Sequence, residues 1–173
     1  MIKDLILLAV SFVLVAASVE DMARLRISNI FPMLVAGLFA VWVAVVGWES
    51  DIWHNGVIFL GVFALGCGLF ALRWMGGGDV KLMAACALWF DWLGAIPWFI
   101  YITVGGGVLA LVIMAGRRLV PQAARSNSSI AILAGKGPIP YGVAIALGTI
   151  MALYLTGPNP SGMARLPDFV HGL

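Results

Sequence analysis

The chain has 173 residues, of which 62% are hydrophobic and only 10% are charged. An average soluble domain has about a quarter of its residues charged, and 10 basic and 8 acidic side chains could hardly cover the polar surface that a domain of this size needs. This composition excludes an ordinary soluble protein and predicts lipid as the solvent. A net charge of +2, without any basic run longer than two arginines, gives no indication of nucleic-acid binding.

Six apolar segments approach the length of roughly 20 residues that a helix needs to cross a bilayer core about 30 Å thick. The sequence therefore predicts an all-α polytopic membrane protein, with a single domain over residues 1–173 and six transmembrane helices. Glycines along the third segment would allow close helix contact. The predicted spans are residues 5–19, 30–48, 52–72, 80–90, 95–115 and 139–156.

The first segment also fits a cleaved signal peptide, because its apolar run has the length of a signal-peptide core and ends in small residues. However, Lys3 is cancelled by Asp4, whereas Arg24 and Arg26 follow the apolar run. This order of charges favours an uncleaved helix with its N-terminus outside the cell.

Basic side chains mark one face of the predicted bundle. Six alternating spans place eight of the ten basic residues on one side, which is then the cytoplasmic side. The acids on that side are Glu20, Asp21 and Asp79. The longest loop, residues 116–138, also lies there, and we expect its apolar patch at 130–134 to rest on the membrane surface. The eight basic residues are Arg24, Arg26, Arg73, Lys81, Arg117, Arg118, Arg125 and Lys136.

Two aspartates of this inner face are candidates for a functional site. Asp21 follows the first span, and Asp79 opens the fourth span after three glycines. The chain between them crosses the membrane twice, so both carboxylates return to the same face and can meet. Counting about 1.5 Å per residue back from Asp91 places Asp79 roughly 18 Å deep, below the inner interface. A carboxylate at such a depth is costly and is by default a functional candidate.

Two adjoining carboxyl groups support the chemistry of an aspartyl peptidase. They cannot both ionise cheaply, so we expect the pair to share one proton near neutral pH. The ionised member would activate a water and the protonated member would polarise the scissile carbonyl, with no metal or organic cofactor. The alternatives are a helix N-cap at Asp79 and a solvated interfacial acid at Asp21. Cys67 and Cys86 indicate neither a disulfide framework nor a zinc site.

Three patches of sequence carry a family resemblance. They are Asp21 with its basic continuation through Arg24, Arg26, Ile27 and Asn29, the GGGDVKL run at 76–82, and the IPYGVAIA run at 139–146. In this order the patches resemble the type IV prepilin peptidase family, the GxGD membrane aspartyl peptidases, and most closely its short CpaA/TadV-type members. The six-span plan is also similar to that family.

The resemblance implies that Asp21 and Asp79 are the catalytic pair of an aspartic endopeptidase. The implied substrate is a prepilin, of the Flp type, with a basic leader before an apolar helix. Cleavage is then expected at the cytoplasmic face of the bacterial inner membrane, and other membrane proteins of pilus assembly are expected partners. The residues expected to bind substrate or shape the site are Gly76, Gly77, Gly78, Pro140, Tyr141 and Gly142, although Pro140 and Gly142 also suit a simple helix start.

Longer members of that family carry a cytoplasmic insertion with two cysteine pairs and also methylate the new N-terminus. This chain has only residues 21–29 between its first two spans, so no methyltransferase domain is expected. We expect Lys81 to anchor at the membrane interface and Glu20 to be a surface acid. Arg24 and Arg26 are expected to fix the orientation in the membrane.

The sequence leaves three alternative functions. A preflagellin-type peptidase would apply the same aspartates to a different precursor. A small transporter coupled to protons or cations could also use them, although the chain lacks two inverted halves. An inactive scaffold of the secretion apparatus is a third alternative, which no feature of the sequence favours.

Overall fold

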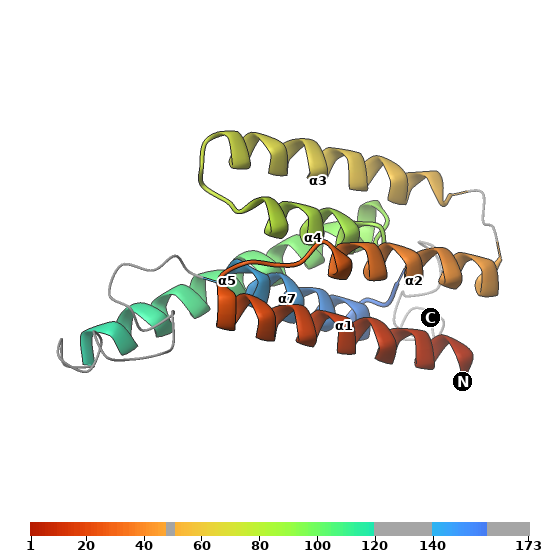
Figure 1. Cartoon of the computed structure of the whole chain (residues 1–173). Helices are drawn as coiled ribbons and strands as arrows, with labels where there is room; N and C mark the ends of the chain where they lie inside the picture. Colours follow the sequence, from red (N-terminus) through yellow and green to blue (C-terminus); the bar gives the residue numbers. More distant parts are fainter. Residues whose placement is uncertain (48–50, 120–139, 159–173) are drawn as a thin grey trace, which may run out of the picture.

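The structure is a computed structural model that describes residues 1–47, 51–119 and 140–158. Within these ranges the secondary structure is helical, which confirms the predicted all-α class (Figure 1). The patch predicted at 130–134 lies outside the described residues. The helices are α1 (Ile2–Arg24), α2 (Ile30–Val46), α3 (Trp53–Ala71), α4 (Gly77–Ala87), α5 (Trp92–Leu119) and α7 (Tyr141–Leu155).

Helix α1 extends further at both ends than the apolar segment predicted at 5–19. At its start, the terminal amine forms an ion pair of 2.8 Å with Asp4. At its end, the helix continues past Asp21 to Arg24 and stops where Leu25 adopts a left-handed conformation with φ 52°. Asp21 therefore lies on the last turn of α1.

Among the described residues, three helices are long and apolar enough to cross a membrane: α1, α3 and residues 92–116 of α5. The apolar helices α2 and α7 have 17 and 15 residues. Helix α4 has 11 residues, which corresponds to about 16 Å, or roughly half of a bilayer core. The chain is thus a membrane protein, while six complete crossings stay a prediction.

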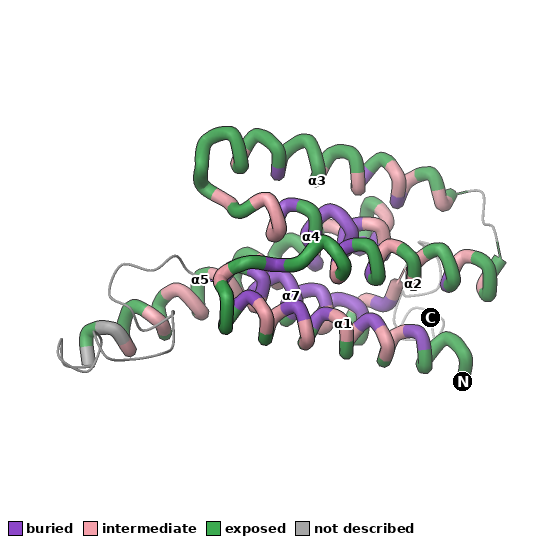
Figure 2. The backbone as a smooth tube through the Cα atoms, in the orientation of Figure 1, coloured by how far each residue is buried: buried purple, intermediate pink, exposed green. Residues whose placement is uncertain are grey.

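The outer surface is apolar, as expected for a protein in lipid. On α1, Leu5, Leu8 and Phe12 face outward with 59–76% of their surface exposed. Buried residues instead concentrate on α4 and α7, whereas α3 is mostly exposed (Figure 2). An apolar exterior of this extent would be unfavourable in water, because burial of such side chains drives the folding of soluble domains.

Helix α4 occupies the centre of the bundle and packs against α2, α3 and α7, while α1 packs against α2 and α7. The Trp89 indole N–H, just after α4, donates to the Val35 carbonyl of α2 at 3.3 Å. The Trp98 indole N–H of α5 donates to the Thr149 hydroxyl of α7 at 2.9 Å. These contacts hold the bundle so that the end of α1 and the starts of α4 and α7 lie at the same end of the molecule (Figure 1).

Candidate active site

Asp21 is buried where the end of α1 meets the start of α7. Only 4% of its surface is exposed, and its Oδ2 accepts a hydrogen bond of 2.8 Å from the Gly142 backbone N–H. A Cβ atom at position 142 would lie 2.8 Å from that same oxygen, so the close approach requires glycine. Donor and acceptor are 121 positions apart in the sequence, so this contact is a product of the tertiary fold.

Asp79 lies on the first turn of α4, where the positive end of the helix dipole favours a carboxylate. Its side chain is partly buried, and its Oδ1 is fully enclosed without a hydrogen-bond partner among the described residues. A Cβ atom at the preceding Gly76 would lie 2.8 Å from Asp79 Oδ2. The glycine before the helix thus gives the carboxylate the space to fold back over the start of α4.

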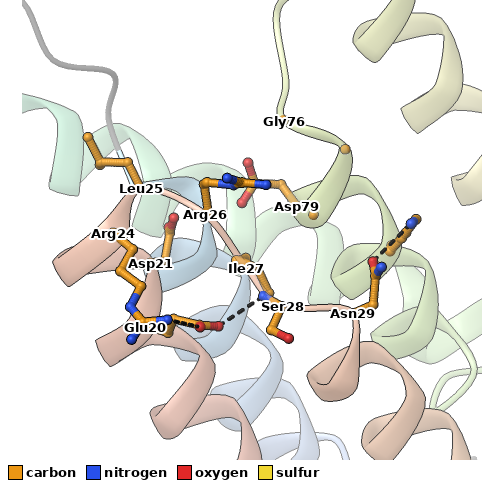
Figure 3. A pocket seen from close by; sticks show the side chains of 13 residues that line it. Glu20, Asp21, Arg24, Leu25, Arg26, Ile27, Ser28, Asn29, Gly76 and Asp79 are labelled. Carbon is orange, nitrogen blue, oxygen red and sulfur yellow. Dashed lines mark hydrogen bonds and ion pairs between the residues drawn. The ribbon is translucent and has the colours of Figure 1, made fainter.

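The two aspartates face the same space. Both line a polar cavity of about 630 Å³, whose other polar side chains include Glu20, Arg26 and Ser28 (Figure 3). Both also line a second cavity of about 610 Å³, which we call the aromatic cavity because Phe70, Trp74 and Tyr141 line it. The predicted meeting of Asp21 and Asp79 is therefore present in the fold.

The α1–α2 loop, residues 25–29, joins the three sequence patches. Its Ile27 is buried between the start of α4 and the start of α7. A Cβ atom at Gly78 would lie 2.9 Å from the Ile27 carbonyl oxygen, and one at Gly142 would lie 2.7 Å from Ile27 Cδ1. Ile27 is a site-shaping residue that the sequence did not identify, although it belongs to the first patch. Its signal in the sequence was its place in that patch.

Two polar contacts fix this loop to the helices that carry the aspartates. Glu20 Oε2 accepts a hydrogen bond of 2.9 Å from the Ser28 backbone N–H of the loop. Within α1, Glu20 Oε1 also lies 3.5 Å from Arg24 Nη1. Glu20 is therefore not an idle surface acid. Lys81 Nζ donates to Asn29 Oδ1 at 2.9 Å and lines the polar cavity, so its ammonium group connects α4 to the loop.

The remaining predicted site residues divide between the two cavities and the helix starts. Gly76, Gly77 and Gly78 line the polar cavity, and Gly76 also lines the aromatic cavity. Tyr141 lines the aromatic cavity, whereas Pro140 is the buried N-cap residue of α7. The described parts of the chain contain no group of three His, Cys, Asp or Glu side chains that could hold a metal ion. The arrangement can support acid–base chemistry between two carboxyl groups.

Comparison with known proteins gives one match. The model of the type IV leader peptidase family matches residues 8–111, a stretch that contains both aspartates and ends before α7. No curated protein matches the chain. No solved structure matches it either. Because the match covers more than half of the chain, this membrane protein belongs to the type IV leader peptidase family, as its sequence patches predicted.

Proposed function

We propose that the chain is a membrane-embedded aspartic endopeptidase that removes the leader peptide from type IV prepilins, with Asp21 and Asp79 as its catalytic pair. The observation that carries the proposal is the presence of two carboxyl groups, from separate helices, on the walls of the same two cavities. Asp79 Oδ1 is enclosed without a partner among the described residues. A polar atom left in this state costs about 1–3 kcal/mol, which a bound water or substrate group would recover.

The surroundings of the two carboxyl groups differ, and this difference supports a separate role for each. The Gly142 N–H donates to Asp21, and such a hydrogen bond stabilises the ionised form. At Asp79 the enclosed Oδ1 has no donor among the described residues, and this favours the protonated form there against the opposing effect of the helix end. Asp21 then takes a proton from a water that attacks the scissile carbonyl, while Asp79 donates a hydrogen bond to the carbonyl oxygen and a proton is later delivered to the leaving amine.

Access for an extended peptide supports the same proposal. The polar and aromatic cavities share four lining residues, which are Asp21, Leu25, Gly76 and Asp79. A peptide that runs from one cavity into the other would pass directly over the two carboxylates. Only an extended segment can do this, because an intact helix hides its amide groups in internal hydrogen bonds.

Family membership and charge support the proposed substrate class. The site end of the bundle carries Arg24, Arg26, Arg73 and Lys81, which supports a cytoplasmic location under the positive-inside rule. A prepilin would present its leader and the start of its apolar helix at that face. We propose small Flp-type pilins as the substrates, and a preflagellin as the alternative precursor for the same residues.

The test is cleavage of purified prepilin by the full chain in lipid, with the variants Asp21→Asn and Asp79→Asn. Each variant should lower the rate at least about a hundredfold, because asparagine can neither accept nor release the proton. Asp4→Asn, an acid at the other end of α1, serves as the matched control and should keep full activity. Persistent cleavage by both site variants would contradict the proposal.

The same preparations separate the alternative functions. Parallel assays with a prepilin and a preflagellin identify the precursor class. Loss of proton uptake into vesicles in either site variant, with cleavage absent even from the unmodified chain, would instead indicate a transporter.

A further inference from the structure

Two apolar hollows follow one another along helices α2, α3 and α4. The one nearer the site, of about 400 Å³, is lined by Ala36 of α2, Phe59 of α3 and Ala84 of α4, among others. The next, of about 600 Å³, is lined by Ala40 of α2, Gly56 of α3 and Leu88 after α4, among others. On each of the three helices the second set lies roughly one turn from the first. We call these two successive hollows together the α2–α3 groove.

Small residues line the α2 wall of this groove. Ala36, Ala40 and Ala44 are spaced four residues apart and therefore form one stripe on the helix. On the opposite wall, a Cβ atom at Gly56 would meet no other atom within 4 Å. Stripes of small residues let a second helix approach closely in a membrane. Here they face a hollow instead of a neighbouring helix of this chain.

The groove leads into the polar cavity of the candidate active site. Asn29 and Lys81 line both the groove and that cavity. Lys81 Nζ donates to Asn29 Oδ1 at 2.9 Å, so the pair marks the boundary between the two spaces. Asp79 precedes Lys81 by two residues on α4. Whatever lies in the groove and continues past this pair therefore enters the space in front of the two aspartates.

We infer that the α2–α3 groove holds the apolar helix of the precursor while the peptide bond before that helix reaches Asp21 and Asp79. This inference rests on the proposed function. The residues of α2 and of its C-cap that line the two hollows run from Pro32 to Gly47, so the groove extends along most of this helix. A helix already in the bilayer would reach the groove sideways without exposing its apolar surface to water. Its N-terminal end lies at Asn29 and Lys81, and the leader precedes it.

Cysteine crosslinking in native membranes tests this location. Cys67 and Cys86 are first replaced by alanine in the full chain carrying Asp79→Asn, so that a bound precursor stays intact. Ala40→Cys then introduces a thiol in the groove, and Leu8→Cys introduces one on the outer face of α1, where Leu8 is 59% exposed. A precursor with one cysteine in its apolar helix should form a disulfide at position 40 and not at position 8. Equal reaction at both positions, or none at 40, would overturn the inference.

A kinetic experiment separates this inference from the proposed function. In the active chain, Ala40→Trp fills the groove and should raise KM for the prepilin about tenfold while kcat changes less than roughly twofold. Leu8→Trp should change neither constant. Cleavage with an unchanged KM in Ala40→Trp would leave the peptidase proposal intact and overturn the groove. Reaction of position 40 with a photoactivatable lipid, but not with precursor, would assign the groove to lipid and also overturn it.

Discussion

At the scale of single residues, Gly142 shows how the site restricts the side chain that a position can carry. Its N–H donates to Asp21, and the position of a Cβ atom there is already occupied by Asp21 Oδ2 and Ile27 Cδ1. Both neighbours are buried, and one of them is a carboxylate held by the same glycine. Any side chain would therefore move the aspartate whose position we consider essential.

We predict that Gly142→Ala lowers prepilin cleavage at least about tenfold, because a Cβ atom 2.8 Å from Asp21 Oδ2 must displace the carboxylate. Gly105→Ala in α5 is the matched control, since a Cβ atom there meets nothing within 4 Å. This control should keep its activity and gain roughly 0.5–1 kcal/mol of helix stability. Cleavage rates and thermal unfolding of both variants in the same detergent provide the measurement. Full activity of Gly142→Ala would show that the Asp21 contact is not needed.

At the scale of elements, helix α4 is positioned by the helix before it. Gly66 of α3 lies against Val80, and a Cβ atom at position 66 would lie 2.6 Å from Val80 Cγ1. Val80 directly follows Asp79, so the packing of α3 on α4 controls where this carboxylate lies. The short α4 has only 11 residues and depends on such neighbours for its place in the bundle.

Gly66→Ala should therefore destabilise the protein by about 1–3 kcal/mol through overpacking and should reduce cleavage. Val80→Ala combined with Gly66→Ala should restore much of both, because it removes the methyl groups that the new Cβ atom meets. Gly61→Ala on the same helix has open space around its Cβ position and serves as the control. Thermal unfolding and cleavage rates of these three variants and of the unmodified chain test this packing. An unchanged Gly66→Ala protein would contradict close packing at this position.

The lengths of the apolar segments were sufficient to predict where the helices lie, but not where they end. Helix α1 continues past the last apolar residues through Glu20 and Asp21, where Glu20 accepts from Ser28 of the next loop and Asp21 accepts from Gly142 of α7. The sequence also paired Asp21 with Asp79 through a parity argument about membrane crossings. It could not foresee the Lys81 contact with Asn29, 52 residues away, since that contact depends on how α2 and α4 pack.

At the scale of the whole molecule, charge divides the bundle into two ends. Arg24 and Arg26 lie at the site end, and Arg118 lies on the part of α5 that reaches beyond this end. At the opposite end, Asp4 lies on the first turn of α1 and Asp51 lies just before the start of α3. Arginine and lysine near helix ends determine which side of a bacterial membrane those ends occupy. The two ends of the bundle thus have opposite preferences for the cytoplasmic and the outer side of the membrane.

This division predicts that the N-terminus lies outside the cell and that the aspartates open toward the cytoplasm. In a chain with Cys67 and Cys86 replaced by alanine, Asp4→Cys should react with an impermeant maleimide in intact cells. Arg118→Cys should react only after the inner membrane is opened. The reverse pattern would place Asp21 and Asp79 at the outer face, where a leader that has not crossed the membrane could not reach them. Because leader removal needs the basic leader and the carboxylates on one side, that result would contradict the proposed cleavage even if both aspartates were essential.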